Sequence, residues 1–195
     1  MQQEVVIRVS NRHVHLSKAD LETLFGEGYE LTIRNYLGAS KVEFAANETV
    51  TVVGPKGKLE KVRVLGPCRK ATQVELLRSD CFKIGVDAPM RNSGDTAGSA
   101  PLELIAPNGN SIKIAEGGII ALRHIHVGKD AAEAIGVHDG DMVDVHTTGP
   151  RSVVFEKTFI RCGGSSTTFT MHIDVDESNS AGLSEGVIGW IEASK

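Results

Sequence analysis

Apolar and polar residues alternate in short runs along most of this chain, a pattern typical of β-strands. Residues 5–9 are rich in β-branched side chains and run directly into His13 and His15, so they predict the first strand. Ser17 then stands where a helix N-cap is expected, apolar residues follow at helical spacing, and Gly26 supplies a stop. The opening of the chain therefore predicts a strand followed by a short helix.

The middle of the chain continues this strand pattern. We expect short strands at residues 41–44, 49–53, 59–65 and 72–77, with a turn at residues 54–57. A hairpin is predicted at residues 102–115 around Asn108 and Gly109. The irregular stretch at residues 81–98 contains turn formers, charges and hydroxyls at residues 88–95, which favours a functional loop. Several short strands at this spacing favour a barrel or a sandwich.

The second half of the chain repeats the order of the first. Arg12-His13-Val14-His15 returns as Arg123-His124-Ile125-His126, at an offset of 111 residues. Beyond it, the pattern predicts a helix at residues 129–135 and strands at residues 142–146, 153–160 and 167–175. We interpret the chain as a degenerate internal repeat, with a first region at residues 1–98 and a second at residues 99–195.

The two histidine pairs are candidate metal ligands. Residues two apart on a strand share a face, so the imidazoles of each pair project together, and imidazole is a common zinc ligand. At an offset of 97 residues, the strand containing Glu75 aligns with the strand containing His172, and both side chains are strong ligand types. The hypothesis is two metal sites that favour zinc, with the ligands His13, His15 and Glu75 in one and His124, His126 and His172 in the other. The alternative is that the pairs are structural.

Two further stretches carry candidate binding residues. Arg69 follows a Gly-Pro turn that leads into the next predicted strand, where an arginine can bind a phosphate or a carboxylate through two hydrogen bonds. Arg91, Ser93 and Asp95 lie in the predicted functional loop and offer a second contact for an anion or a substrate. Ordinary turn chemistry accounts for these three residues equally well.

Other polar residues of the repeat are weaker candidates. Arg12 and Arg123 adjoin the histidine pairs, but on a regular strand they face the opposite side, which leaves a solvent-facing or a supporting role open. His138 lies in a predicted turn, and His146 has no counterpart histidine in the repeat. Neither histidine is counted as a ligand.

Composition and charge narrow the classes of function. The net charge is −4 and no basic run is interleaved with aromatic residues, which argues against nucleic acid as a partner. The longest apolar runs are strand-sized and no charged-then-apolar leader precedes Val5, so we expect a cytoplasmic protein without a membrane partner. Cys68, Cys81 and Cys162 are odd in number and lack a CxxC spacing, which favours free thiols.

The assembled motifs resemble the PduL-type phosphotransacylases, the phosphate propanoyltransferase family associated with bacterial microcompartment pathways such as propanediol degradation. The resemblance spans nearly the whole chain and rests on residues 9–17, 66–69, 72–75, 88–95 and 122–126. It implies a mostly β fold of two small β-barrels capped by short α-helices. It also implies that the N-terminal strand is exchanged into the other barrel.

The same resemblance implies an activity, cofactors and partners. The reaction is the reversible conversion of a short-chain acyl-CoA, propanoyl or acetyl, and phosphate into an acyl phosphate and CoA. Two zinc ions would be held by the two ligand sets, with Arg69 as the catalytic, phosphate-binding arginine and Ser93 as a substrate-binding residue. A homodimer and association with a microcompartment are also implied. Encapsulated members usually carry an N-terminal amphipathic extension, and only residues 1–4 precede the first predicted strand, which counts against encapsulation.

The ligand pattern alone leaves two alternatives open. Two adjacent metal ions could activate water against an ester or a phosphoester, as in a dinuclear zinc hydrolase. The chain could instead be a metal-stabilised binding module without an enzymatic activity.

Overall fold

The computed structural model describes residues 2–37 and 41–192. The chain divides into two compact units. Unit 1 contains residues 1–11 and 122–195, and unit 2 contains residues 12–121. The continuous unit 2 is therefore inserted between the two segments of unit 1.

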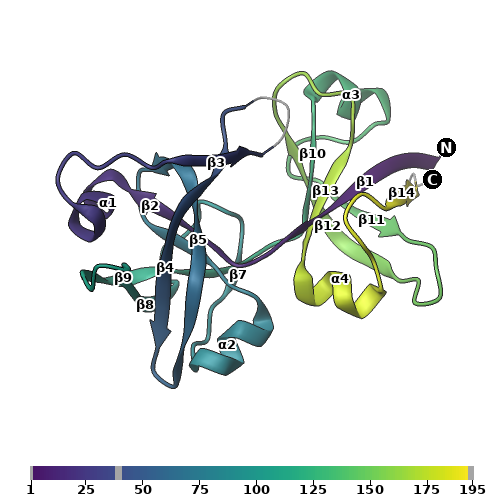
Figure 1. The fold of residues 1–195 in the computed structure, drawn as a ribbon. Helices are drawn as coiled ribbons and strands as arrows, with labels where there is room; N and C mark the ends of the chain where they lie inside the picture. Colours follow the sequence, from purple (N-terminus) through teal and green to yellow (C-terminus); the bar gives the residue numbers. More distant parts are fainter. Residues whose placement is uncertain (1, 38–40, 193–195) are drawn as a thin grey trace. The chain divides into compact units, whose positions relative to one another are not determined.

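Unit 2 is a closed barrel of six strands with short flanking elements (Figure 1). The barrel strands, in the order in which they are hydrogen-bonded, are β4 (Phe44–Gly54), β5 (Gly57–Arg69), β2 (His13–Ser17), β6 (Gln73–Glu75), β9 (Ser111–Ala121) and β8 (Ala100–Ile105). Pairing of β8 with β4 closes the ring. Outside it lie β3 (Ile33–Tyr36), β7 (Met90–Arg91), α1 (Lys18–Phe25) and α2 (Arg78–Ile84).

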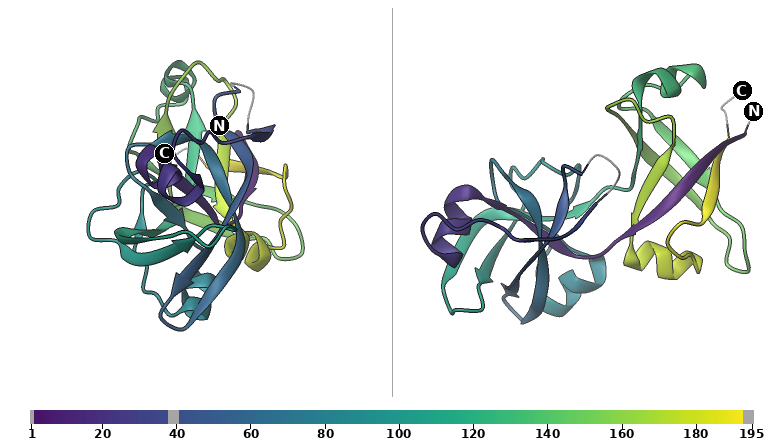
Figure 2. Two further views of the ribbon diagram at one scale, coloured as in Figure 1. Left: turned by 60° about the vertical axis from the view of Figure 1, so that its left-hand side comes forward. Right: turned by 45° about the horizontal axis from the view of Figure 1, so that its top comes forward.

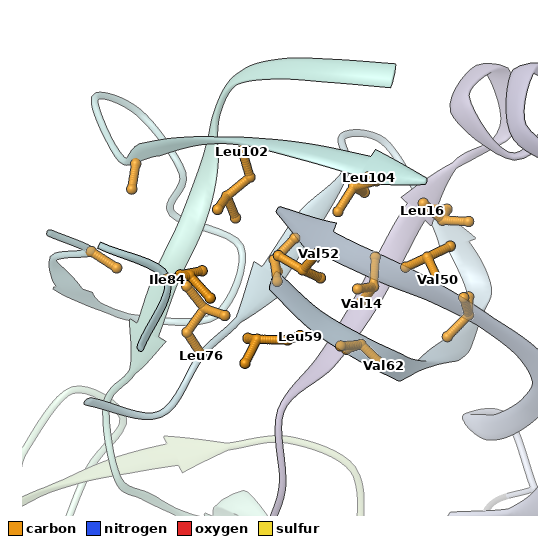
Figure 3. Packing of buried hydrophobic residues seen from close by; sticks show 14 of the residues in the cluster. Val14, Leu16, Val50, Val52, Leu59, Val62, Leu76, Ile84, Leu102 and Leu104 are labelled. Carbon is orange, nitrogen blue, oxygen red and sulfur yellow. The ribbon is translucent and has the colours of Figure 1, made fainter. Parts of the chain in front are cut away.

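The interior of unit 2 is filled by alternate residues of these strands. Val14 and Leu16 of β2 are fully buried among Val50 and Val52 of β4 and apolar residues of the other strands (Figure 3). Because side chains alternate across a strand, burial of Val14 directs His13 and His15 to the other face of β2. The apolar core thus decides which way the first histidine pair points.

Unit 1 is a second closed barrel of six strands. Its strands, again in the order in which they are hydrogen-bonded, are β1 (Gln2–Ser10), β13 (Thr170–Asp174), β10 (His124–Val127), β12 (Val154–Cys162), β11 (Met142–His146) and β14 (Ile188–Glu192). Two short helices, α3 (Lys129–Ala134) and α4 (Val175–Ala181), accompany it. Ile125 and Met171 are fully buried in its core, one on each of the strands that carry the second set of histidines. The prediction of a mostly β fold with two small barrels and short helices is confirmed.

The strand that precedes each histidine pair lies in the opposite barrel. β1 leads along the chain into β2 of unit 2, yet it pairs in parallel with β13 and antiparallel with β14 of unit 1. Figure 1 and the right-hand view of Figure 2 show the purple β1 beside the yellow-green strands of that barrel. β9 leads into β10 of unit 1, yet it pairs in parallel with β6 and antiparallel with β8 of unit 2. Because β8 and β9 complete unit 2, the border expected between residues 98 and 99 falls inside that unit.

The predicted ends of the first helix are confirmed, and so is the predicted hairpin. The Ser17 hydroxyl accepts a hydrogen bond from the Asp20 amide at the start of α1, and the helix ends at Gly26. β8 and β9 form the predicted hairpin. The strand expected at residues 41–44 begins only at Phe44, where it is continuous with the following segment as β4.

Five elements of the described residues were not predicted, namely α2, α4, β3, β7 and β14. The helix α2 has only seven residues, too few to display a helical period, and it ends at Gly85 in the left-handed conformation. The strand expected at residues 167–175 stops at Asp174, because the Asp174 side chain caps α4 and Glu177 closes a capping box. Valine at position 175 prolonged the apolar alternation past the true end of the strand.

The free state of Cys68, Cys81 and Cys162 is confirmed. Within residues 2–37 and 41–192, no helix is long and apolar enough to cross a membrane.

Candidate functional site

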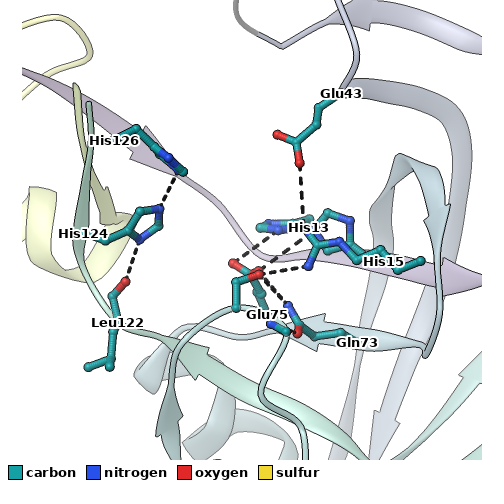
Figure 4. A network of polar contacts seen from close by, with 11 residues as sticks. His13, His15, Glu43, Gln73, Glu75, Leu122, His124 and His126 are labelled. Carbon is teal, nitrogen blue, oxygen red and sulfur yellow. Dashed lines mark hydrogen bonds and ion pairs between the residues drawn. The ribbon is translucent and has the colours of Figure 1, made fainter. Parts of the chain in front are cut away.

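The first ligand set is assembled by two neighbouring antiparallel strands of unit 2. In the β2–β6 pair, His13 is directly opposite Glu75, and His15 is opposite Gln73. His13 Nε2 lies 3.3 Å from Glu75 Oε2, and His15 Nε2 lies 3.9 Å from Glu75 Oε1. Figure 4 shows the three side chains pointing toward one another. Their candidate ligand atoms all lie within 4.8 Å of each other, which fits a single metal ion.

The electrostatic environment keeps His15 and Glu75 in the forms that bind metal. Burial, the neighbouring His13 and the Arg69 charge lower the pKa of His15 to about 3, so its imidazole is neutral at pH 7. Burial alone would raise the pKa of Glu75, but the histidines and the Ser93 hydroxyl outweigh burial and hold that pKa below its usual range. Neutral imidazole and ionised carboxylate are the protonation states that a metal ion requires.

A hydrogen-bond network surrounds the Glu75 carboxylate. Glu75 Oε1 accepts hydrogen bonds from Ser93 Oγ at 2.7 Å and from Gln73 Nε2 at 2.8 Å. The Gln73 amide also lies 3.0 Å from Ser93 Oγ, and its oxygen accepts the Gly94 N–H at 2.7 Å. The loop at residues 92–94 is therefore held against the strand that carries Glu75.

Arg69 reaches the same network from the end of β5. Its Nη1 donates to Ser93 Oγ at 2.9 Å, so a single hydroxyl joins Arg69 to Glu75. Its Nη2 lies 3.8 Å from Glu43 Oε1, and about a third of the Arg69 side chain is exposed (31%). The guanidinium is therefore both anchored and accessible to an anion. The other two candidate residues of the loop, Arg91 and Asp95, form an ion pair with each other at 3.3 Å.

The second ligand set lies in unit 1 and is built in the same way. His124 of β10 is directly opposite His172 of β13, as His13 is opposite Glu75 in the other unit. The ring centroid of His172 is 5.3 Å from that of His124 and 5.2 Å from that of His126. His124 Nε2 lies 3.0 Å from His126 Nε2. The three imidazoles are thus gathered at one place.

The hydrogen bonding of His124 and the environment of His172 also suit metal binding. The contact of 2.8 Å between His124 Nδ1 and the Leu122 carbonyl oxygen fixes Nδ1 as the donor, which leaves the Nε2 lone pair directed at His126 (Figure 4). Burial and the two neighbouring histidines lower the pKa of His172 to about 4, so this ring is neutral at pH 7. Three imidazoles are a donor set typical of zinc.

The arginines that precede each histidine pair contact carboxylates, a buried one at Asp80 and a partly buried one at Glu177. Arg12 Nε donates to Asp80 Oδ2 at 2.6 Å, and Arg123 Nη1 donates to Glu177 Oε1 at 2.6 Å. Neither arginine is simply solvent-facing. The sequence pattern alone could not identify their partners, because α2 and α4 were not predicted.

Gln73 is the residue of the first site that was missed from the sequence. It is 2% exposed, and its amide contacts Glu75, Ser93 and Gly94. The available signal was its position two residues before Glu75 on the same strand, which places both side chains on one face. A polar residue at that position beside a candidate ligand indicates a supporting contact.

The fold and the two residue sets define a class of protein: a double β-barrel whose repeated strands each present a His-x-His pair to a third ligand-type side chain. Residues 6–184 match the family model described as phosphate propanoyltransferase. The chain therefore belongs to the phosphate propanoyltransferase family, and it is an acyltransferase.

Curated relatives agree with this assignment. A phosphate propanoyltransferase of Thermotoga maritima is 50% identical over 96% of this chain and 88% of its own. One from Lachnoclostridium phytofermentans is 49% identical over 94% of this chain and 85% of its own. One from Rhodobacter capsulatus is 50% identical over 92% of this chain and 82% of its own. These similarities extend across both units.

Proposed function

We propose that the protein interconverts a short-chain acyl-CoA and phosphate with an acyl phosphate and CoA. The observation that carries the proposal is the connection of Arg69 through the Ser93 hydroxyl to Glu75. This connection joins the partly exposed Arg69 guanidinium, which is suited to binding phosphate, to the carboxylate of Glu75, one of the three proposed metal ligands of unit 2. The relatives' name, phosphate propanoyltransferase, supports propanoyl as the acyl group, with acetyl as the one-carbon-shorter alternative.

Arg69 has the chemistry to bind and orient phosphate. A phosphate dianion paired with the guanidinium is held in place with part of its charge offset, while an oxygen outside the pair stays free to attack. The Ser93 hydroxyl accepts a hydrogen bond from Arg69 and donates its own hydrogen to Glu75, so it lies beside any phosphate that Arg69 binds. In this proposal Arg69 is the catalytic residue, and Ser93 binds substrate.

The reaction balances without a covalent enzyme intermediate. A phosphate oxygen forms a bond to the thioester carbonyl carbon, and the resulting tetrahedral species collapses by breaking the carbon–sulfur bond. The products are the acyl phosphate and the CoA thiolate, which takes up a proton in solution. A cysteine nucleophile is not needed. Burial raises the pKa of the thiols of Cys68, Cys81 and Cys162, which disfavours the thiolate form of each.

Two zinc ions are proposed as cofactors, one for each residue set. His13, His15 and Glu75 would hold one ion, and His124, His126 and His172 would hold the other. Zinc bound in this way supplies a Lewis acid that stabilises a thiolate near neutral pH. The chain itself orients the proposed ligand atoms. Hydrogen bonds to Glu75 Oε1 hold its carboxylate in place, and the contact of His124 Nδ1 leaves the Nε2 lone pair of that ring available.

A cytoplasmic location, a homodimer and association with a microcompartment belong to the same proposal. The family resemblance supports the homodimer and the association with a microcompartment. Sedimentation of the purified protein tests the oligomeric state, and co-purification with microcompartment shells tests the association. A monomer, or a chain absent from purified shells, would remove the corresponding part of the proposal.

The experiment that tests the proposed activity is thiol release from propanoyl-CoA and acetyl-CoA, with and without phosphate, before and after chelation of metal. Thiol release that needs both phosphate and metal supports the proposal. Release without phosphate indicates a dinuclear zinc hydrolase instead. If activity is absent and chelation removes the circular dichroism signal of the fold, the protein is a metal-stabilised binding module.

A further inference from the structure

The chain passes between its two units twice, and an arginine marks both passages. The first passage lies between Ser10, the end of β1, and His13, the start of β2. The second lies between Ala121, the end of β9, and His124, the start of β10. Each connection has two residues, and the second of them is Arg12 or Arg123.

Each arginine binds the helix that follows the strand carrying the third ligand. Arg12 pairs with Asp80 of α2, and Arg123 pairs with Glu177 of α4, both at 2.6 Å. Asp80 lies five residues after Glu75, and Glu177 lies five residues after His172. The two ion pairs therefore occupy the same position in the repeat, although the carboxylates differ by one methylene.

The carboxylates at these positions are already fixed by their helices. Each is the third residue of its helix and accepts a hydrogen bond from the N-cap backbone, from Leu77 in the case of Asp80 and from Asp174 in the case of Glu177. The Asp80 side chain is 3% exposed and the Glu177 side chain is 24% exposed. A partly buried arginine that is bound to such a carboxylate has few accessible side-chain conformations. Its backbone is restrained as a result, and so is the position of the histidine that follows it.

The two ion pairs reinforce the pairing of the strands that carry the proposed ligands. His13 is opposite Glu75 across β2 and β6, and Arg12, the residue before His13, is bonded to the helix after β6. His124 and His172 have the same relationship across β10 and β13, with Arg123 bonded to α4. The first residue of each histidine pair is consequently fixed by a strand pairing and by the ion pair beside it.

We propose that Arg12 and Arg123 are matched positioning residues, which hold each histidine pair opposite its third ligand where the chain enters a new barrel. They touch neither substrate nor metal in this scheme. The proposal rests on the proposed function for the identity of the metal. Its structural part, the placement of the two strands, can be tested without metal.

The test compares Arg12→Gln and Arg123→Gln with the unmodified protein and with Arg78→Gln. Arg78 is a matched control because it lies on α2, two residues before Asp80, and its ion pair with Asp87 at 3.4 Å is largely exposed. The first measurement is hydrogen–deuterium exchange of the metal-free proteins over residues 11–17 and 122–127. Faster exchange is expected at residues 11–17 in Arg12→Gln and at residues 122–127 in Arg123→Gln, with neither change in Arg78→Gln.

The second measurement is zinc affinity by competition with a chromogenic chelator. Loss of a residue that orients a metal ligand weakens binding about 10- to 100-fold, and each variant should weaken one of the two bound ions. Arg12→Lys, which keeps the charge without the planar fork, should recover part of the affinity and replaces Arg12→Gln if that variant does not fold. Unchanged zinc affinity in both glutamine variants would overturn the proposal, even if exchange is faster.

A failure of the proposed function gives a different result. If the unmodified protein binds no zinc, the metal assignment is wrong, and the exchange of the metal-free strands alone decides the role of the arginines. Local acceleration confined to the strand beside the mutated arginine then supports the positioning role. Exchange equal to that of Arg78→Gln rejects it.

Discussion

His13 and Glu75 are directly opposite each other on β2 and β6, with 3.3 Å between His13 Nε2 and Glu75 Oε2. Their counterparts in the repeat, His124 and His172, are opposite each other on β10 and β13. The same register thus presents a carboxylate in one unit and an imidazole in the other. If both sets bind zinc, one ion receives a negative ligand and the other receives only neutral ones.

This difference leads to a prediction about metal content. Glu75→Gln and His172→Gln should each lower the zinc bound per chain from two ions to one, because each removes one of three ligands from a different set. Metal analysis after gel filtration measures this, with circular dichroism as the check on folding. A content of two ions in either variant would contradict the assignment of that residue as a ligand.

Arg69→Ala should raise the phosphate concentration needed for half-maximal rate and lower turnover, while zinc stays bound. A roughly 100-fold loss of kcat/KM for phosphate is expected, because the guanidinium both binds the anion and offsets its charge. Initial rates of thiol release at varied phosphate measure the effect, and Arg78→Gln is the control for loss of a positive charge. An unchanged phosphate dependence would exclude Arg69 from this role.

Gln73→Met should impair activity by loosening the loop at residues 92–94. The substitution keeps the volume but removes the amide that contacts Glu75 and Ser93, and it leaves the Gly94 N–H without its acceptor. Loss of such buried hydrogen bonds costs about 1–3 kcal/mol of unfolding free energy. Urea denaturation measures that loss, and kinetics should show a lower kcat. Wild-type kcat together with the expected destabilisation would mean that Gln73 serves the fold alone.

The stability of unit 2 should depend on pH through Glu48. Burial alone would raise the pKa of this carboxyl, but hydrogen bonds from Thr32 and Tyr29 outweigh it, so the pKa lies below its ordinary value of 4.5. A lowered folded-state pKa contributes stability that is present above the unfolded pKa and is lost as pH falls through the folded pKa.

Glu48→Gln removes this contribution. At pH 7 the variant should be less stable by about 1 kcal/mol, since hydrogen bonds to a charged group are stronger than those to a neutral one. The difference from the unmodified protein should shrink as pH is lowered below 4.5. Urea midpoints at pH 7, 5 and about 3.5 provide the measurement. A difference that is constant with pH would show that the Glu48 charge is not responsible.

Replacing Cys68 and Cys162 together by alanine should leave kcat near that of the unmodified protein, because no step proposed above uses a thiol of the chain. Both thiols have a raised pKa, so neither is poised as a thiolate. Thiol release kinetics test this directly. Loss of activity with metal content and folding intact would point to a covalent acyl-enzyme.

Much of this architecture could be predicted because the chain repeats itself. Glu75 and His172 were identified by aligning the two halves, and the structure brings each next to its histidine pair because strand register follows the same alternation that the sequence shows. The short helices α2 and α4 could not be predicted, since their caps lie where apolar alternation continues. The contact of Ser93 with Glu75 depends on the path of an irregular loop, which local pattern does not determine.

The insertion of unit 2 between the two segments of unit 1 has a consequence for synthesis on the ribosome. Unit 2 is complete once residue 121 has emerged, whereas β1 is made first and must wait for its neighbours β13 and β14. At about 5–20 residues per second, that delay is on the order of ten seconds. During this delay the backbone N–H and C=O groups of β1 have no strand partner. In the nascent chain, β1 is therefore a segment exposed to aggregation through its unpaired edge.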